Sequence, residues 1–568
     1  IIFQIFKFLI MLNFFKYRYL RRIRKRISGH YIFEKNNKHA WSANLRRSLM
    51  NLVIKFEELK FSKFIFHNDF KEAEIALHQN IKNFFYNVNA GISSTAFDEA
   101  IKQYFSNKKY ESSFNIIMPY QHFQFLKKQN INVSKKLWFL TWHLYLIKKI
   151  FMGLFVGFFF IINNFKCLFK KNLNEKYIHV ENLDVLKNLD QIDNQKESFF
   201  LNKIIDVEKI SLSSKLNIYI GPIIGNNIKF YLKKYKNFDN KKFLIKYEVP
   251  PCLSLYNILD NLKFIGWFVI SLVIIFFSFF SGRWWNIILF DDSIKKYLIK
   301  FSSNKNTPQI FIRTFNGNVE YPMSIPELKK KGCKVIFCFY SINGEGYLTE
   351  QHNPIDHSSW GHLKWDYIYC WNNYHKKYLI DNLKLNNNYD PDKITFNVVG
   401  PIGFNILKRR NNFNFNQNKN ICVFDIRIRK TIIRSKSSYY SILDAEYVSK
   451  FLFDISETCL ELNINMLHKE KRFSSKISPD HKKYSSTLLS LKHNKNYFNI
   501  DYETCVEDIM DNSIASISLP YTSIPFMSNK PAVYYDPLNK IISNEKNGIK
   551  IIKNKNDLKK WLKFLLNK

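Results

Sequence analysis

The stretch TPQIFIRTFNGNVEYPMSIPELKKKGCKVIFCFYS, residues 307–341, decides the fold class. Its two ends, TPQIFIRTF and CKVIFCFYS, are apolar runs of strand length. Between them, MSIPELKKKG has the pattern of a helix that ends at Gly332. A strand that is apolar on both faces belongs in a parallel sheet covered by helices. The stretch therefore predicts a strand–helix–strand unit of an α/β protein.

The same alternation continues to the end of the chain. Further strands are predicted in WDYIYCWN, KITFNVVG, ICVFDIRI, INMLHK, IASISL and PAVYYD, and helices in NYHKKYLIDNL, AEYVSKFLFDISETCLEL, VEDIMDNS and NDLKKWLKFLLNK. The Asn-rich segment 409–420 interrupts the alternation and reads as a linker. We therefore predict two Rossmann-like α/β lobes, 166–405 and 421–568, after a helical, membrane-associating region at 1–165.

The composition restricts the class of protein. The 568 residues are 46% hydrophobic, which is enough for more than one core, and only 16 are glycine and 15 proline. The eight cysteines form no CxxC pair, so we expect a reducing compartment and no zinc ribbon. The net charge is +39, yet lysine is spread evenly and no nucleic-acid-binding motif appears. This favours an anionic membrane surface as a partner and not nucleic acid.

The N-terminal residues indicate contact with a membrane. Residues 1–15 are apolar and are followed directly by the basic run KYRYLRRIRKR at 16–26. A signal peptide has its charges before the apolar run. The order here fits a membrane-associated helix with a cytoplasmic basic flank, or equally an amphipathic helix that packs on the body.

Two further apolar runs lie within the chain. The run at 137–162 is split by Lys148 and Lys149, and the 13 uncharged residues after them are short for a span. The run at 264–282 has 19 uncharged residues, the length of a bilayer helix, and Arg283 follows it. This second run is predicted to contact the membrane, and spanning, a hairpin with the first run and burial in a lobe all stay open.

Several motifs occur in a characteristic order in the second half of the chain. They are CFYSINGEGY (338–347), WDYIYCWN (365–372), VVGPIGF (398–404), VFDIRI (423–428), LHKEKR (467–472) and SISLPYTSIPFMSNKPAVYYDP (516–537). Together they resemble the surface polysaccharide biosynthesis proteins named for a Pro-Phe-Thr-Ser motif, which look like GT-B glycosyltransferases. The resemblance covers roughly residues 285–568. Here Tyr521 replaces the phenylalanine, and Glu470 interrupts the basic run of LHKEKR.

The resemblance implies a function in cell-surface glycan synthesis. We expect a protein on the cytoplasmic face of the membrane that moves a sugar from a nucleotide-sugar donor to a lipid-linked or growing glycan acceptor. We expect no cofactor and no metal, because no DxD triplet suggests a divalent-metal site. The sugar, the nucleotide, the linkage and the acceptor are not specified by the residues.

The residues after two C-terminal strands predict a donor phosphate site. Thr522 and Ser523 follow the strand IASISL, where a helix starting near Thr522 would point free N–H groups at an anion. Lys469, Lys471 and Arg472 end another strand of the same lobe, and arginine binds phosphate in a bidentate manner. The alternatives are a helix cap for the two hydroxyls and a solvated basic loop for the cations.

Other polar residues are weaker candidates. Asp425 and Arg427 end the first strand of the C-terminal lobe and would face the same cleft, although Asp425 is equally a turn or cap residue. His481 in SPDHKKY is a further cleft candidate.

Glycosyl transfer also needs a base that accepts the proton of the acceptor hydroxyl. On the N-terminal lobe, Glu345 lies between two glycines in a loop directly after a buried strand, and Asp356 and His357 follow in the next loop. We expect the base first among these three, with a plain loop as the alternative, and Asp366 is a further candidate.

Two other functions are compatible with the same residues. The fold suits the transfer of a polyol phosphate, as in teichoic-acid-type polymerases. A non-catalytic membrane-bound scaffold of polysaccharide assembly would need neither a donor site nor a base. The transferase alternatives require a basic cleft between the lobes, whereas a scaffold does not.

Overall fold

The structure is a computed structural model. It describes residues 32–33, 120, 131–132, 135–170, 176–181, 204–209, 216–221, 238–239, 243–314, 321–339, 342, 365–385, 390–401, 420–428, 445–470, 480–501, 504, 506–520, 522, 524–527, 530–541, 543–546 and 548–567. Most of the region predicted to be helical at the N-terminus, including the apolar run at 1–15, lies outside these residues. Within it, β1 (Ile32–Phe33) pairs antiparallel with β2 (Ile131–Asn132).

The N-terminal lobe surrounds a sheet with the strand order β10-β9-β8-β7-β3-β4-β6-β5, and all neighbours are parallel except the edge strand β5. Its strands are β3 (Tyr177–Glu181), β4 (Leu216–Gly221), β5 (Phe238–Asp239), β6 (Phe243–Lys246), β7 (Ile310–Thr314), β8 (Lys334–Cys338), β9 (Tyr367–Cys370) and β10 (Thr395–Val398). The helix α11 (Ile325–Lys330) links β7 to β8, and α12 (Asn373–Leu385) links β9 towards β10. The strand–helix–strand unit at 307–341 is therefore confirmed.

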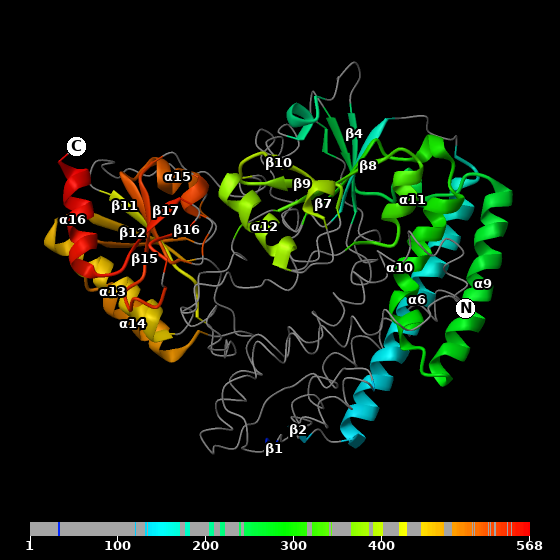
Figure 1. The fold of residues 1–568 in the computed structure, drawn as a ribbon, viewed down its shortest axis with the longest axis horizontal. Helices are drawn as coiled ribbons and strands as arrows, with labels where there is room; N and C mark the ends of the chain where they lie inside the picture. Colours follow the sequence, from blue (N-terminus) through cyan, green and yellow to red (C-terminus); the bar gives the residue numbers. More distant parts are fainter. Residues whose placement is uncertain are drawn as a thin grey trace.

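The C-terminal lobe has a second sheet, with the order β13-β12-β11-β14-β15-β17-β16 and one antiparallel edge strand, β16. Its strands are β11 (Asn420–Phe424), β12 (Asn465–Lys469), β13 (Tyr497–Ile500), β14 (Ala515–Ser518), β15 (Ala532–Tyr535), β16 (Glu545–Lys546) and β17 (Ile549–Ile552). Its helices are α13 (Ala445–Glu461), α14 (Lys482–Leu491), α15 (Val506–Asp511) and α16 (Lys555–Leu566). The predicted fold class, two α/β lobes with largely parallel sheets, is confirmed (Figure 1).

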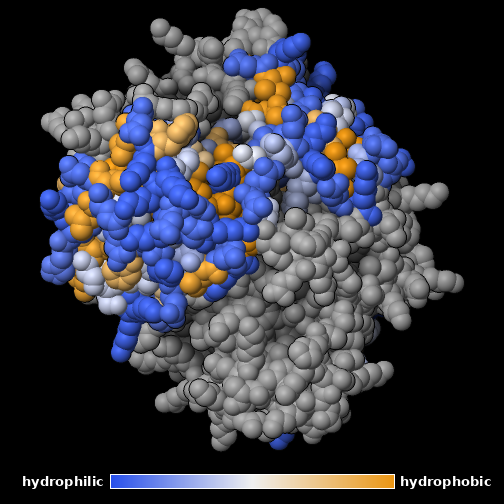
Figure 2. Space-filling model, turned by 60° about the vertical axis from the view of Figure 1, so that its left-hand side comes forward, coloured by the Kyte–Doolittle hydropathy of each residue, from blue (hydrophilic) through white to orange (hydrophobic). Residues whose placement is uncertain are grey.

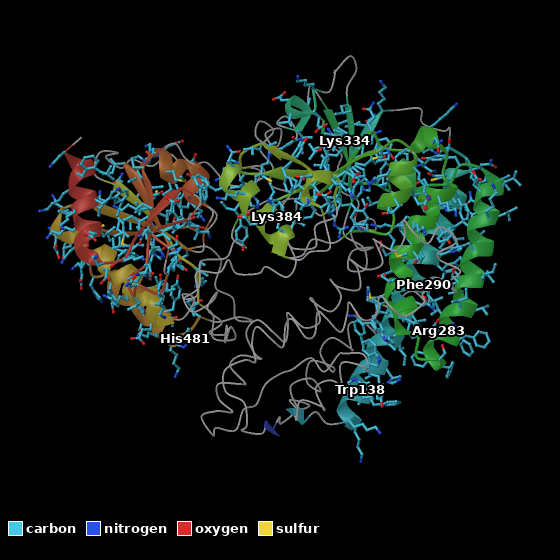
Figure 3. The ribbon with its side chains drawn as sticks, in the orientation of Figure 1. Trp138, Arg283, Phe290, Lys334, Lys384 and His481 are labelled. Carbon is cyan, nitrogen blue, oxygen red and sulfur yellow. The ribbon has the colours of Figure 1, made fainter. Side chains whose placement is uncertain are left out.

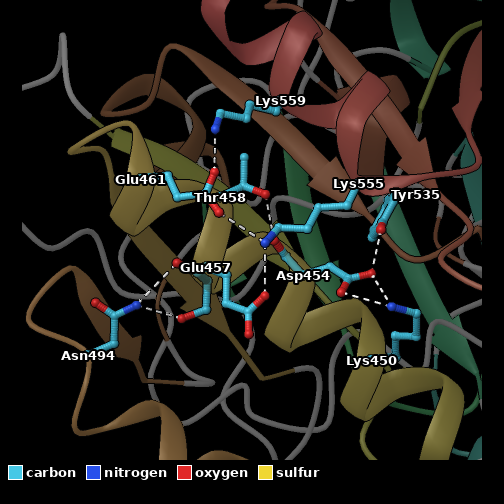
Figure 4. Close-up of polar contacts among 10 residues, drawn as sticks. Lys450, Asp454, Glu457, Thr458, Glu461, Asn494, Tyr535, Lys555 and Lys559 are labelled. Carbon is cyan, nitrogen blue, oxygen red and sulfur yellow. Dashed lines mark hydrogen bonds and ion pairs between the residues drawn. The ribbon is translucent and has the colours of Figure 1, made fainter.

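The last helix is attached to the lobe by both ion pairs and apolar burial. Lys555 on α16 lies 2.9 Å from Glu457 and 3.1 Å from Glu461 on α13, and Lys559 lies 2.5 Å from Glu461 (Figure 4). Exposed pairs of this kind contribute about 0 to 1 kcal/mol each. The fully buried Leu558 and Leu562 therefore provide most of the attachment. The rest of this face is largely hydrophilic, with small hydrophobic patches (Figure 2).

Three helices pack together beside the N-terminal lobe (Figure 1). They are α6 (Lys135–Cys167), α9 (Ile258–Phe280) and α10 (Trp284–Phe301). The two halves of the split apolar run form one continuous helix, α6, and both α6 and α9 are long and apolar enough to cross a membrane. Lys149, which splits the run, lies 3.3 Å from Asp291 on α10. The ion pair with Asp291 thus explains how the charged Lys149 can lie in the middle of an apolar helix.

Two glycines allow the close approach of these helices. A Cβ atom on Gly153 of α6 would lie 2.1 Å from the ring of Phe290, and one on Gly157 would lie 2.1 Å from the ring of Phe268. The two rings come from α10 and α9 and stack on each other with centroids 6.0 Å apart. The Gly-x-x-x-Gly spacing places both glycines on one face of α6, as in closely packed membrane helices. Figure 3 shows Phe290 within the bundle, and Trp138 and Arg283 towards one end of it.

We expect Gly157→Ala to destabilise the bundle by about 1 to 3 kcal/mol, because the added methyl group overlaps the Phe268 ring in a packed interior. Gly266→Ala on α9 is the matched control. No atom lies within 4 Å of its added Cβ, so better helix propensity should leave stability unchanged or raise it by up to about 1 kcal/mol. Thermal unfolding of the two variants in detergent measures the difference. Equal melting temperatures would show that α6 and α9 do not pack at Gly157.

One tyrosine fixes both ends of the α9–α10 hairpin. The Tyr177 hydroxyl on β3 accepts a hydrogen bond from the Cys252 backbone N–H, just before α9, at 3.0 Å. The same hydroxyl donates to the Asn306 carbonyl, just after α10, at 2.6 Å. The hairpin therefore leaves and rejoins the lobe at the same place.

Candidate functional site

The motif loop begins where β14 ends, at the carboxyl edge of the C-terminal sheet. The Leu519 N–H donates to the Phe424 carbonyl at 2.9 Å, and the Thr522 N–H donates to the Leu519 carbonyl at 3.0 Å, which turns the chain. Among the described residues that follow Thr522, the expected helix is replaced by a single 3-10 turn, η10 (Ile524–Met527). A helix dipole therefore does not contribute to anion binding here.

Two side chains from neighbouring strands hold the motif loop. The Tyr534 hydroxyl on β15 donates to the Thr522 carbonyl at 2.6 Å. The Lys546 ammonium on β16 donates to the Pro520 carbonyl at 3.4 Å, and it lies 5.7 Å from the centroid of the Tyr534 ring. The carbonyl groups of Pro520 and Thr522 are thus both bound, and the loop is attached to the sheet at these two points.

Three buried hydroxyls lie in and before this loop. Thr522 is 1% exposed, and Ser516 and Ser518 on β14 are equally buried. None of the three hydroxyls has a hydrogen-bond partner among the residues that the structure describes. Buried hydroxyls without a partner are uncommon and costly, so these three oxygens keep an unused hydrogen-bonding capacity. Ser523, the other predicted hydroxyl, lies outside the described residues.

The motif loop lies at the junction of the two lobes. Phe526, in the turn after the motif, packs against the cores of both lobes. Nearby, the Tyr374 ring of α12 covers Gly548, where a Cβ atom would lie 2.8 Å from the ring. Burial and, second, the charge of Lys546 lower the pKa of His375 on α12 to about 3. Side chains of the N-terminal lobe therefore come within reach of the motif.

The predicted basic strand end is partly neutralised. Lys469 is buried at the end of β12, and Lys471 and Arg472 lie outside the described residues. Glu470, the acid that interrupts the basic run, binds the Arg427 guanidinium, which also binds Asp480 through Nε at 2.5 Å. Two carboxylates thus occupy Arg427, and its structural role is to join the ends of β11 and β12.

The remaining predicted residues of this lobe belong to structural contacts. The buried Asp425 carboxylate accepts a hydrogen bond from the Tyr484 hydroxyl at 2.6 Å, and His468 Nε2 lies 3.3 Å from the same carboxylate. Burial and then the charge of Asp425 raise the pKa of Tyr484. His481 caps α14, where its ring accepts a hydrogen bond from the Lys483 N–H at 3.3 Å (Figure 3). Asp425 and His481 are thus both engaged in contacts within the C-terminal lobe.

The three residues predicted as the base, Glu345, Asp356 and His357, lie outside the described residues. What the structure describes at the carboxyl ends of β3 and β7 is a buried charge cluster. Glu181 lies 2.8 Å from Lys295 on α10 and 3.2 Å from Arg313 on β7, and all three side chains are almost fully buried. Burial alone would raise the pKa of Glu181, but the two cations hold it below its ordinary value.

Two more titratable groups adjoin this cluster. Burial lowers the pKa of His179 on β3 to about 4, so the imidazole is neutral at pH 7. Burial also raises the pKa of Asp292 on α10 to about 6, although its carboxylate accepts a hydrogen bond from the Met323 N–H at 2.8 Å. The cluster was not predictable from the sequence, because the histidine and the glutamate in YIHVE are typical of a polar loop and not of a buried strand.

The comparison with family models gives one match. The model of the polysaccharide biosynthesis PFTS motif proteins matches residues 268–562, just over half of the chain. This range includes α10, the later strands of the first sheet and the whole motif loop. No curated protein matches the chain in sequence.

Solved structures give only distant similarities. The UDP-GlcNAc 2-epimerase of Methanocaldococcus jannaschii is 12% identical with a TM-score of 0.32, over 69% of this chain and 93% of that one. An α,α-trehalose-phosphate synthase (UDP-forming) of Burkholderia vietnamiensis is 8% identical with a TM-score of 0.34, over 69% and 89%. A glycosyltransferase of Rickettsia africae is 11% identical with a TM-score of 0.30, over 70% and 89%. The fold assignment therefore rests on the sheet order of this chain itself.

Proposed function

This chain belongs to the family of polysaccharide biosynthesis PFTS motif proteins, and from that premise we propose that it is a glycosyltransferase. It transfers a sugar from a nucleotide-sugar donor to a lipid-linked or growing cell-surface glycan. The observation that carries this proposal is the motif loop with its buried Thr522 hydroxyl. The loop follows a parallel strand at the carboxyl edge of its sheet, where α/β lobes bind their ligands.

The reaction assigns a role to each group of residues. The acceptor hydroxyl attacks the anomeric carbon of the donor, the bond to the phosphate oxygen breaks, and the nucleoside diphosphate leaves. Thr522, Ser523, Lys471 and Arg472 stabilise the charge of that leaving group without a metal. Glu345 accepts the proton of the acceptor hydroxyl, with Asp356 and His357 as the other candidates.

The three-helix bundle supports a location at the membrane. We propose that it is attached to the cytoplasmic face of the membrane through the outer faces of α6 and α9. Nine large apolar residues of α9 are exposed: Ile258, Leu259, Leu262, Val269, Ile270, Val273, Phe276, Phe277 and Phe280. Their spacing of three or four residues forms one stripe along the helix, opposite its buried face. A lipid-linked acceptor would be held at the same surface.

Nucleotide binding by the full chain in detergent tests the proposal. We expect calorimetry with a panel of nucleotide sugars to give a micromolar dissociation constant for at least one, and the same constant in EDTA. Thr522→Ala should weaken that binding about tenfold or more, because a hydroxyl on a charged ligand contributes roughly 1.5 to 3 kcal/mol.

Thr487→Ala is the matched control. It removes the same atoms from a buried site of the same lobe, where the hydroxyl bonds to Ser449 at 2.8 Å, away from the motif. A folded wild-type chain that binds none of the panel would contradict the donor site and favour the scaffold alternative. Binding of a polyol-phosphate nucleotide alone would favour the second transferase alternative. Loss of binding in EDTA would contradict metal independence.

A further inference from the structure

We infer that Phe526, in the turn directly after the motif, is the apolar anchor that docks the C-terminal lobe on the N-terminal lobe. The inference goes beyond the proposed function, because it concerns the surface between the lobes and holds whichever group the motif loop binds. The partner that it assigns to η10 lies in the same chain and is the apolar core to which α12 contributes.

The packing of η10 is the first argument. Phe526 is partly buried, and it packs against the core that contains Leu379 and Leu383 of α12. It also packs against the main core of the C-terminal lobe. Ile524, in the same turn, packs against a second cluster of the C-terminal lobe. Of the partly buried apolar side chains that the structure describes, Phe526 alone adjoins cores of both lobes.

The rest of the junction is small. Over the ranges that the structure describes, no helix or strand of one lobe packs extensively along an element of the other. Figure 1 shows α12 and β10 on the side of the N-terminal lobe that faces the C-terminal lobe. There the Tyr374 ring of α12 covers Gly548, but Tyr374 is 52% exposed, so this contact removes little apolar surface from water. Phe526 is therefore expected to dominate the docking.

The turn is attached to its own lobe as well. η10 packs on β14 and β15, and the Tyr534 hydroxyl of β15 binds the carbonyl of Thr522 just before the turn at 2.6 Å. One end of the anchor is thus fixed to the C-terminal sheet, and the Phe526 ring reaches the other lobe. The position of the motif loop over the N-terminal lobe is consequently set by this side chain.

A single ring can have this effect because the lobes belong to one chain. Tethering makes docking an intramolecular event with an effective concentration on the order of millimolar. A contact far smaller than the interface of two separate proteins, which buries roughly 1,600 Å², is then sufficient. Removal of the Phe526 ring should raise the ratio of undocked to docked chains about tenfold.

Hydrogen exchange followed by mass spectrometry, on the full chain in detergent and without any ligand, tests the inference. In Phe526→Ala we expect the amides of α12 to exchange about tenfold faster, because undocking uncovers this helix of the other lobe. Phe526→Leu keeps an apolar side chain and should give a smaller increase of about threefold. Ile524→Ala is the matched control in the same turn and should leave exchange in α12 unchanged. The central strand β7 is the internal reference.

The outcomes distinguish docking from support of the C-terminal lobe alone. Wild-type exchange in α12 of a folded Phe526→Ala chain would show that other contacts hold the lobes together, and the inference would be wrong. An equal increase in Phe526→Ala and Ile524→Ala would contradict it as well, because the turn would then act only through its own lobe. If Phe526→Ala does not fold, Phe526→Leu against Ile524→Ala makes the same comparison. A chain that binds no nucleotide contradicts the proposed function and leaves this result unaffected.

Discussion

Replacing Glu181 by glutamine is expected to lower the free energy of unfolding of the N-terminal lobe by about 3 to 5 kcal/mol. The substitution keeps the size of the side chain and removes its charge. Lys295 and Arg313 would then be two buried cations without their shared carboxylate. Breaking a buried pair from one side is far more costly than the net contribution of the pair, because the remaining charge stays desolvated. Because the Glu181 carboxylate pairs with two cations, we expect the loss of stability to lie at the upper end of this range.

Asp366→Asn is the matched control, because it makes the same chemical change at an exposed ion pair. Asp366 lies 2.8 Å from Lys329, both side chains are more than one third exposed, and the expected loss is below about 1 kcal/mol. Urea unfolding is followed by tryptophan fluorescence. This signal reports mainly on the part of the chain that contains the N-terminal lobe, because nine of the ten tryptophans precede residue 400. Equal midpoints for the two variants would mean that Lys295 and Arg313 find other negative partners.

Most of the strands and helices that follow Thr307 were predictable because local pattern and tertiary environment agree there. Runs such as VIFCF at 335–339 are apolar at every position, and β8 is buried almost throughout. The helix α14 was not predicted, because its buried residues Tyr484, Thr487 and Leu491 form a narrow stripe in an otherwise polar segment. The strand β3 was also not predicted, because its sequence contains the polar residues His179 and Glu181. Burial of Glu181 depends on cations from α10 and β7, which lie far away in the sequence.

The candidate site was predictable only in part, for a related reason. The motif loop could be located, because a strand that ends in polar residues near the C-terminus is a local feature. In place of the helix expected after it, the described residues form a single 3-10 turn, η10. The contact of Lys546 with Pro520 depends on the order of four strands, and no local pattern contains that order. Likewise, Arg427 was expected to face a ligand, but it binds two carboxylates from distant segments.

The geometry of the bundle restricts how it meets a membrane. The hairpin of α9 and α10 starts and ends beside Tyr177, so α9 cannot cross a bilayer unless α10 crosses back. The middle of α10 carries Asp291, Lys295 and Lys296, which are buried and would have to enter the hydrocarbon. We therefore expect the helices to lie against one leaflet. The apolar stripe of α9, 23 residues or roughly 34 Å long, would then run along the membrane surface.

A double substitution in this stripe, Val273→Asp with Phe277→Asp, is expected to release the protein from vesicles. The two residues lie one turn apart, and both are more than half exposed. Transfer of both side chains into lipid contributes about 3 kcal/mol or more, so the partition coefficient should fall roughly a hundredfold. Flotation with vesicles that contain phosphatidylglycerol measures the loss. Neutral vesicles and high salt should weaken binding of the wild-type chain, because its charge of +39 attracts an anionic surface.

Leu489→Asp with Phe564→Asp provides the control for added negative charge. These residues are similarly exposed, but they lie on α14 and α16 of the other lobe. The control variant should bind vesicles as the wild-type chain does. If both double variants were released alike, net charge and not the α9 stripe would determine membrane binding. If neither were released, the bilayer would contact another part of the chain, and the one-leaflet arrangement of α6 and α9 would be wrong.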